Sequence, residues 1–422
     1  ACDKRLESPL IPAWLIKIEP PAPMGGGPPD GRATSVAQCV SDIEVADFVA
    51  LDLEFSGLFL NVERDRRSLG LQEYFQKCIE SIPQFLALQL GVCCARQRLE
   101  RGGMWELRSH EFNLWPQERR LFTSDLQSLR FLRAHGFDFN AFFEQAHAYN
   151  RLPPPPTGDV VGSAADAKAV AASRQQPGHA THILGALRKA RIPIVVHNGL
   201  LDLLHLHDKF LGDLPEDIAQ FGEAWTAQFP ILFDTRLLAQ EGRFQVLKHQ
   251  GGLSLDELHR HLTGLPKIGT APRFERAGPL PDAGPAHGSS GQDATITAEV
   301  FLMEIDLFLR ADATSSGARK RRRRAAPEAA EAEAEAETAP SSQAAESAAA
   351  GDDGDDGAWA VVQRKRPRDE AATGGLVSPT LLESHEVCRR FHNRLAIVGA
   401  SPGVMVLGRP PGPPSLAPPA KG

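Results

Sequence analysis

The segment FVALDLEFSGL, residues 48–58, carries two carboxylates, Asp52 and Glu54, in a run that otherwise consists of apolar residues. Such a run predicts a buried β-strand. Alternate residues of a strand share a face, so Asp52 and Glu54 project to one side while Leu51 and Leu53 project to the other. Because burying unpaired carboxylates is costly, the segment either lies half-exposed at a sheet edge or binds a divalent cation through its oxygens.

The order of apolar patterns along the chain predicts an α/β fold. Residues 85–96 and 105–115 are two further strands whose short connections favour an antiparallel meander with 48–55. After residue 124 the apolar spacing becomes helical. A buried strand over 193–196 then leads into a helix, for which Asn198 is a predicted N-cap, and residues 232–240, 253–264 and 293–310 predict further helices. We therefore expect a mixed central sheet, an antiparallel meander plus parallel strands, flanked by helices.

The 422 residues divide into regions of different composition. Residues 36–310 have the size of one domain, since single cores seldom exceed about 250–300 residues. Residues 1–35 are rich in Pro and Gly, and residues 311–380 combine basic runs with an acidic Ala/Glu repeat, so we expect disorder in both. Residues 381–422 predict a short ordered segment and a Pro-rich tail. The net charge of −7 is an average over these separate blocks.

Two classes of protein are not favoured by the sequence. The six cysteines form no C-x-x-C pair and no Cys/His array with zinc-ligand spacing, so we predict a reduced, intracellular protein without a zinc domain. No segment approaches the roughly 18 uninterrupted apolar residues of a membrane-spanning helix. We therefore expect a soluble protein with no membrane partner.

Two further acids extend the Asp52 and Glu54 pair. Asp202 lies one helical turn past Asn198, where a parallel strand ends and where open α/β sheets place their ligands. Asp293 begins an apolar helix, with His287 six residues upstream. Four acids from one strand and two helices could converge on a two-metal centre.

Five motifs occur in an order that resembles the DEDD superfamily of 3′–5′ exonucleases. They are FVALDLEFSGL, GFDFN at 136–140, HNGLLDLLHL at 197–206, FPILFDTRLLA at 229–239 and H-x-x-x-G-x-D at 287–293. Over residues 45–310 they resemble the CAF/PARN deadenylase family, which implies an RNase H-like exonuclease fold. HNGL, RKRRRR and FHNRLAIVG look closest to the nuclear member called Target of EGR one. Each motif alone is weak, and the combination is specific.

The resemblance implies a Mg²⁺-dependent 3′–5′ exoribonuclease of the poly(A)-specific type that trims nuclear RNAs such as small nuclear RNAs. It assigns Asp52, Glu54, Asp202 and Asp293 to two Mg²⁺ ions, with Mn²⁺ as an alternative, and His287 to the general base. The substrate would be RNA with a 3′ hydroxyl end. The candidate residues for contacting this RNA are Phe55, Ser56, Gly57, Leu58, Asn198 and Arg236. A homodimer, which relatives often form, is left open.

The basic run predicts a nuclear localisation signal read by an import receptor. Its residues are Arg319, Lys320, Arg321, Arg322, Arg323 and Arg324. The same run could contact phosphates, or remain solvated beside the acidic repeat. The interpretation as a nuclear localisation signal predicts that the protein lies in the nucleoplasm, the nucleolus or Cajal bodies.

Several departures keep other functions open. The family places its catalytic His five residues before the last Asp, whereas His287 and Asp293 are six apart. A catalytically weak or inactive RNA-binding relative is therefore the main alternative, and a DNA-directed proofreading exonuclease is a third. Asp234 could steady Arg236, cap a helix or bind metal. We also find no Cys₃His zinc finger, RNA-recognition domain or membrane anchor of the kinds that relatives carry.

Overall fold

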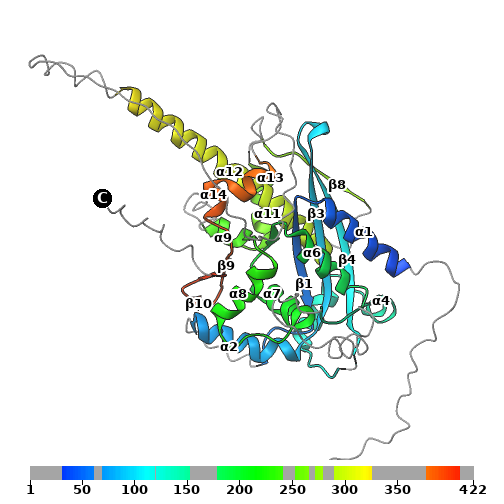
Figure 1. The fold of residues 1–422 in the computed structure, drawn as a ribbon. Helices are drawn as coiled ribbons and strands as arrows, with labels where there is room; N and C mark the ends of the chain where they lie inside the picture. The colour runs from blue at the N-terminus through cyan, green and yellow to red at the C-terminus, as the bar shows by residue number, and fades with distance from the viewer. Residues whose placement is uncertain are drawn as a thin grey trace, which may run out of the picture.

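The computed structural model describes residues 31–60, 69–118, 120–152, 178–240, 252–265, 271–278, 289–325 and 377–408. Within these residues the chain forms a seven-stranded sheet in the order β5-β4-β3-β1-β6-β7, with β8 also paired to β4 (Figure 1). Helices cover both faces. This arrangement confirms the predicted α/β fold with a mixed sheet.

The centre of the sheet is the predicted antiparallel meander, formed by β1 (Phe48–Phe55), β3 (Ala87–Arg98) and β4 (Met104–Pro116). On the other side of β1, β6 (Ile194–Val196) and β7 (Leu232–Asp234) continue the sheet in parallel. Both β5 (His147–Tyr149) and β8 (Phe274–Ala277) run parallel to β4. Two small sheets lie outside it and consist of β2 (Leu69–Gly70) with β10 (Ala400–Ser401), and β9 (Arg394–Ala396) with β11 (Val404–Val406).

The helices that matter for the site follow the strands closely. α7 (Leu200–Leu206) follows β6, α9 (Thr235–Gln240) follows β7, and α12 (Ser290–Ala325) crosses the sheet. Among the described residues, the other α-helices are α1 (Gly31–Val45), α2 (Leu71–Ser81), α3 (Leu126–Ala134), α4 (Phe139–Gln145), α6 (Thr181–Ala190), α8 (Ile218–Gln228), α11 (Leu255–Gly264), α13 (Pro379–Ser384) and α14 (Glu386–Arg389). Short 3₁₀ helices lie at Ile82–Gln84 and Leu99–Arg101, and a π-helical turn follows α7 at His207–Leu211.

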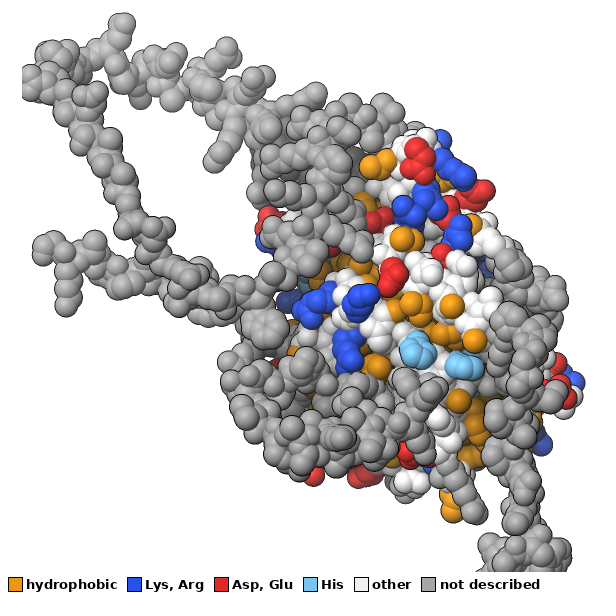
Figure 2. Space-filling view, turned by 45° about the vertical axis from the view of Figure 1, so that its right-hand side comes forward, with side chains coloured by type: hydrophobic (Ala, Val, Ile, Leu, Met, Phe, Trp, Pro, Cys, Tyr) orange, Lys and Arg blue, Asp and Glu red, His pale blue; other side chains and the backbone are white. Residues whose placement is uncertain are grey.

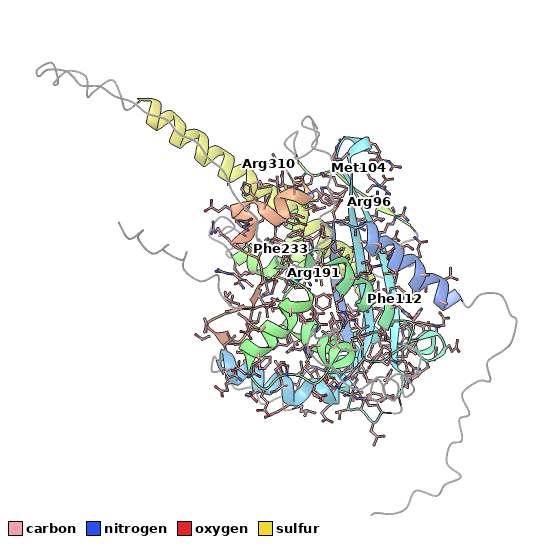
Figure 3. The ribbon with its side chains drawn as sticks, viewed as in Figure 1. Arg96, Met104, Phe112, Arg191, Phe233 and Arg310 are labelled. Carbon is pink, nitrogen blue, oxygen red and sulfur yellow. The ribbon has the colours of Figure 1, made fainter. Side chains whose placement is uncertain are left out.

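The two faces of the sheet carry separate apolar cores. On one face, Val49, Leu51 and Leu53 of β1 pack with residues of α1, α6 and α7. On the other, Phe48 and Ala50 pack with residues of α11 and α12. Figure 3 labels one buried ring from each core, Phe112 of β4 and Phe233 of β7. β1 is thus apolar on both faces because it is a central strand.

The described surface is mixed in charge. In Figure 2, Lys and Arg side chains lie beside Asp and Glu side chains near the top of the described surface, with apolar side chains between the charged groups. None of the helices within the described ranges is both long and apolar enough to span a membrane.

Three predicted boundaries differ from the structure. Helix α1 begins at Gly31, five residues before the expected start of the domain at 36 and inside the segment 1–35 for which we expected disorder. Residues 232–234 form the strand β7, where we predicted only helix, because a three-residue apolar run cannot be distinguished from a helix start by periodicity. Helix α12 runs past the expected domain end at 310 to Ala325, which agrees with the high helix propensity of Ala, Arg and Lys.

The described C-terminal segment, residues 377–408, folds back onto the edge of the sheet at β7. The backbone amide of Asn393 donates a hydrogen bond of 2.9 Å to the carbonyl of Leu232. In return the side-chain oxygen of Asn393 accepts from the amide of Leu232, also at 2.9 Å. These bonds join the segment before β9 to β7. A part of the chain beyond residue 376 therefore packs against the edge of the sheet.

Candidate active site

The sheet face beneath α12 changes from apolar to acidic along β1. Phe48 and Ala50 lie under the body of α12, and Asp52 and Glu54 continue the same face beyond them. Asp52 pairs with Gly91 of β3 and Glu54 pairs with Gln89. Both carboxylates are partly accessible to solvent. The strand therefore carries its charges where the helix above it begins.

The N-terminus of α12 is fixed directly onto this polar half of the sheet. Oε1 of Gln89 accepts hydrogen bonds of 3.0 Å from the amide and from the hydroxyl of Ser290. Oε2 of Glu111 accepts the amide of Gly291 at 3.2 Å. A Cβ at Gly91 would lie 1.8 Å from the carbonyl oxygen of Ser290, so only glycine allows this approach.

This docking places Asp293, in the first turn of α12, beside the strand acids. Carboxylate oxygens of Asp52, Glu54 and Asp293 all lie within 4.8 Å of one another. Asp202 reaches the same place from α7, because its Oδ1 accepts the backbone amide of Leu53 at 2.9 Å. The structure thus brings together the four acids that the sequence singled out.

Burial and mutual repulsion raise the pKa values of three of the four carboxylates. Burial, with the charges of Asp202, Asp293 and Glu54, raises the pKa of Asp52 well above its usual range. Burial, with the charges of Asp293, Asp202 and Glu111, raises the pKa of Glu54 to about 8. Burial also raises the pKa of Asp202 to about 7. Without a cation, these shifts favour the protonated forms of the carboxylates.

The donor set fits hard divalent cations. It consists of carboxylate oxygens from β1, α7 and α12, which is the ligand type that Mg²⁺ and Mn²⁺ prefer. The cluster is partly accessible, so hydrated ions can enter. A cation would also offset the mutual repulsion that raises the pKa values of these acids. The repulsion among these carboxylates, which is unfavourable in the free protein, therefore favours cation binding.

Residues 55–58, from the last residue of β1 onward, were predicted to contact RNA, and they have different environments. The ring of Phe55 stacks on His205 at a centroid distance of 4.1 Å. The Ser56 hydroxyl is buried, donates to the carbonyl of Thr123 and accepts from the amide of Leu86. Ser56 is therefore an internal anchor, which corrects its assignment as an RNA contact.

Gly57 and Leu58 also differ from each other in burial. A Cβ at Gly57 would lie 2.3 Å from the ring of Phe85, so this position requires glycine for packing. Leu58 is 44% exposed and is available for contact with a ligand.

Asp234 organises the residues behind the site. Its Oδ1 accepts the backbone amides of Asn198 and Arg236, and its Oδ2 accepts the amide of Ala396, each at 2.9 Å. The carboxylate is fully buried. Asp234 is therefore a structural residue that joins two strand ends to β9, which favours the helix-capping reading over a metal ligand.

Asn198 and Arg236 lie at the rim of this region. Asn198 is exposed and has a φ of 56°, and Gly199 occupies the N-cap of α7, so the predicted cap at Asn198 is wrong. The positive φ turns the chain from β6 into α7 without a side-chain cap. Nη1 of Arg236 donates to the carbonyl of Leu253 at 2.8 Å, and Nε2 of His197 approaches the same carbonyl at 3.1 Å.

Two predicted groups cannot be placed. His287 lies outside the described residues. The basic run 319–324 belongs to the C-terminal turns of α12, which project from the body of the molecule (Figure 1), and its side chains are outside the description. Both assignments remain predictions.

Sequence reasoning missed Gln89, Gly91 and Glu111. All three lie on the α12 face of β3 and β4, where their register aligns them with Glu54 and Asp52. In the sequence, these positions are marked only by polar residues and a glycine inside segments predicted to be strands. Strand register was needed to interpret that signal.

Comparisons with known proteins identify the family of this chain. The model of a family described as "CAF1 family ribonuclease" matches residues 33–153 and 161–301. Poly(A)-specific ribonuclease PARN of Danio rerio is 37% identical over 86 residues, which are 20% of this chain and 13% of that protein. Poly(A)-specific ribonuclease PNLDC1 of Mus musculus is 24% identical over 290 residues, covering 46% of this chain and 54% of that protein. The chain thus covers less than two thirds of either relative.

The chain is also similar to a solved structure. The Mg²⁺- and Mn²⁺-bound form of S. pombe Pop2p has 17% sequence identity and a TM-score of 0.39, with 64% of this chain and 88% of that chain covered.

Proposed function

Since this chain belongs to the CAF1 family of ribonucleases, we propose that it is a divalent-metal-dependent exoribonuclease that shortens RNA from a 3′ hydroxyl end. The observation that carries the proposal is the convergence of Asp52, Glu54 and Asp293 within 4.8 Å, with Asp202 held beside them. The products are nucleoside 5′-monophosphates. The names of the relatives, poly(A)-specific ribonucleases, support adenylated 3′ tails as the substrate class.

Each acid has a defined task in this proposal. Asp52, Glu54, Asp202 and Asp293 would hold two Mg²⁺ ions, which supply a nucleophilic water and stabilise the leaving oxygen. Leu53 orients Asp202 through its amide, and Gln89 with Glu111 holds the helix that carries Asp293. His287 would accept the proton of the attacking water, since an imidazole titrates near neutral pH.

The candidate contacts with the terminal nucleotide are residues at the strand ends beside the four acids. Phe55 and Leu58 flank the end of β1, and both are partly or largely accessible. Asn198 and Arg236 lie at the ends of the two parallel strands next to β1. These positions suit base and phosphate contacts.

The test is Mg²⁺-dependent release of AMP from a 5′-labelled oligo(A) RNA. The expected result is a ladder shortening from the 3′ end, abolished by EDTA, by Asp52→Asn and by Glu54→Gln, and blocked by a 3′-phosphate. A DNA oligomer of the same sequence should react more slowly if the site reads the 2′ hydroxyl. No release by well-folded protein in Mg²⁺ or Mn²⁺ contradicts the proposal.

One observation favours a second candidate, an RNA-binding relative with little activity. His287 and Asp293 are separated by one residue more than the family spacing. A chain of this kind would bind oligo(A) and metal ions without releasing AMP. Equilibrium binding measured beside the release assay distinguishes the two functions.

A nuclear role is a finer part of the proposal. The resemblance of HNGL, RKRRRR and FHNRLAIVG to Target of EGR one supports nuclear small RNAs as substrates, and the run 319–324 supports recognition by an import receptor. Replacing the basic residues of 319–324 by Ala should shift a fluorescent fusion from nucleus to cytoplasm while AMP release persists. Sedimentation analysis tests the homodimer that relatives often form.

A further inference from the structure

A second group of metal-ligand side chains lies on the sheet face opposite the acidic centre. Cys39 comes from α1, Cys94 from β3 and His110 from β4. One ligand atom from each lies within 4.8 Å of the other two. Both cysteines are buried, with exposures of 0% and 3%.

The strand register explains how the two sheet residues meet. Cys94 pairs with Arg108, and His110 is two residues further along β4, so both project from the same face. Helix α1 covers this face and places Cys39 over the pair. The neighbouring Cys93 projects to the other face, where its thiol contacts Thr295 of α12. Two adjacent cysteines therefore have separate environments.

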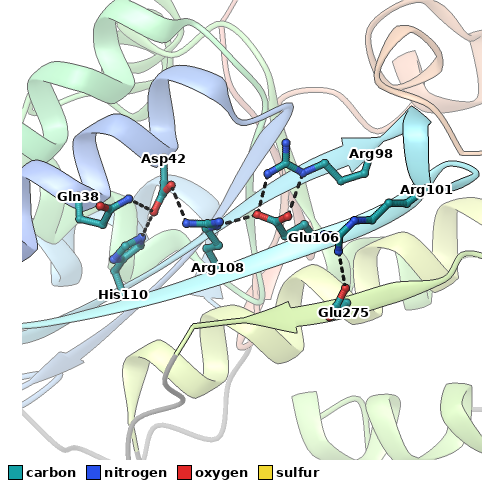
Figure 4. Close-up of polar contacts among 8 residues, drawn as sticks. All are labelled: Gln38, Asp42, Arg98, Arg101, Glu106, Arg108, His110 and Glu275. Atoms are coloured by element: carbon teal, nitrogen blue, oxygen red, sulfur yellow. Dashed lines mark hydrogen bonds and ion pairs between the residues drawn. The ribbon is translucent and has the colours of Figure 1, made fainter.

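A carboxylate holds the histidine in place. Nε2 of His110 lies 3.0 Å from Oδ2 of Asp42, which is one helical turn past Cys39 (Figure 4). Gln38 donates to the same oxygen at 3.2 Å, and Arg108 lies 3.6 Å from the other oxygen. Metal-binding histidines are commonly oriented by a carboxylate in this way, which fixes the tautomer and the ring position.

The ligand chemistry differs from that of the acidic centre. Two sulfurs and an imidazole suit zinc and related transition metals, whereas carboxylate oxygens suit Mg²⁺. In a tetrahedral zinc site the Zn–S distance is about 2.3 Å and the Zn–N distance about 2.0 Å, so ligand atoms lie within about 4 Å of one another. The observed limit of 4.8 Å requires only small side-chain movements.

There is also room for a fourth ligand. A cavity of about 130 Å³ adjoins the group, and both Asp42 and Cys94 line it together with arginines of β3 and β4. It can admit a water molecule, and Asp42 itself is a further oxygen donor.

We propose that Cys39, Cys94 and His110 bind a zinc-class transition-metal ion that ties helix α1 to strands β3 and β4. This site is independent of the proposed exoribonuclease activity. Its role is structural, because it links three elements that are distant in sequence and lies away from the acids on the other face of the sheet.

The first test uses the unmodified chain and Co²⁺ as the probe. The protein is stripped of metals under reducing conditions and titrated with Co²⁺. A thiolate-to-cobalt charge-transfer band in the near ultraviolet should saturate at one ion per chain and disappear when Zn²⁺ is added. The acidic centre offers only oxygen and cannot produce this band. Absence of the band overturns the proposal.

The second test assigns the ligands. Cys39→Ser and Cys94→Ser should each abolish the band and the tightly bound zinc measured by mass spectrometry of the metal. Cys93→Ala is the matched control, since it alters the adjacent thiol on the other face, and it should retain both. The Asp52→Asn/Glu54→Gln double variant should also retain both while losing AMP release.

Two outcomes would contradict the assignment. One is retention of the band in Cys94→Ser with loss in Cys93→Ala. The other is a Cys39–Cys94 disulfide, detected by peptide mapping without reductant, in protein that binds no zinc. If a serine variant fails to fold, the cobalt spectrum of the unmodified chain still decides the question.

Discussion

The backbone amide of Leu53 donates a hydrogen bond of 2.9 Å to Oδ1 of Asp202, across 149 residues of chain. Leu53 is the residue between the two strand acids, so this bond places Asp202 beside Asp52 and Glu54. Asp202 thereby has two separable properties, which are its charge and its ability to accept this hydrogen bond.

Those two properties can be separated by substitution. Asp202→Asn keeps a side-chain oxygen for the Leu53 amide but loses the charge, so we expect near-normal stability with AMP release reduced at least about 100-fold. Asp202→Ala should lose activity and also about 1 kcal/mol of unfolding free energy. Urea denaturation and single-turnover assays measure the two effects. Equal stability losses in both variants would show that the bond is unimportant.

Gly91 should tolerate no side chain. A Cβ there would lie 1.8 Å from the Ser290 carbonyl, which would push the start of α12, and with it Asp293, off the sheet. We expect Gly91→Ala to cost about 3 kcal/mol of unfolding free energy and to abolish AMP release. Gly70→Ala, where nothing lies within 4 Å of the added Cβ, is the control and should change activity little. An active, stable Gly91→Ala protein would contradict the observed docking of α12.

The metal-free protein should lose stability as pH rises. Burial and neighbouring acids raise the pKa of Glu54 from 4.5 to about 8 and that of Asp202 from 3.8 to about 7. The folded state therefore binds these protons more tightly than the unfolded state, and their contribution declines from about pH 4.5 upward until both groups are ionised near pH 8. Calorimetry in EDTA should show this decline.

Mg²⁺ should reverse the decline because it binds the ionised carboxylates, so its effect on Tm should be larger at about pH 8 than at about pH 5. The Asp52→Asn/Glu54→Gln variant should have a flatter profile in EDTA and little response to Mg²⁺. Identical pH profiles for this variant and the unmodified chain would show that other groups cause the dependence.

His287 should affect turnover and leave RNA binding nearly unchanged. A general base typically contributes about 10²–10⁴-fold to the rate, so His287→Ala should lower kcat by that order with little change in KM. The control is the same substitution at His182, an exposed histidine of α6, which should leave kcat unchanged. Deleting Gly288 restores the family spacing to Asp293 and should leave activity equal or higher. A large loss on deletion would show that this chain requires its own spacing.

Asp234 should be needed for stability and not for metal binding. Asp234→Ala leaves three backbone amides without their acceptor, of which the amide of Ala396 is buried, and we expect a loss of about 2–4 kcal/mol. Hydrogen exchange at Ala396 should become faster, because that amide donates to Asp234. Asp217→Ala, which removes a helix cap in α8, should be milder. Loss of metal affinity with unchanged exchange would instead place Asp234 in the metal site.

Local patterns in the sequence were sufficient for the strands of the meander and for the acids. Alternation along β1 predicted that Asp52 and Glu54 share a face, and the order of motifs identified Asp202 and Asp293. The shared face of Asp52 and Glu54 follows from the geometry of a single strand, so it can be predicted from a few neighbouring residues. The assignment of Asp202 and Asp293 rested on the resemblance of the motifs to a known family. The helix interpretation of residues 232–234 was wrong because that run is too short to show a period.

Only the tertiary structure decided which groups meet. The close approach of Ser290 to Gly91, the support of α12 by Gln89 and Glu111, and the return of the C-terminal segment to Asp234 depend on strand register and on contacts between distant elements. The group formed by Cys39, Cys94 and His110 has no recognisable spacing for the same reason. Sequence patterns report which face a residue occupies, and the packing of helices on the sheet determines what that residue contacts.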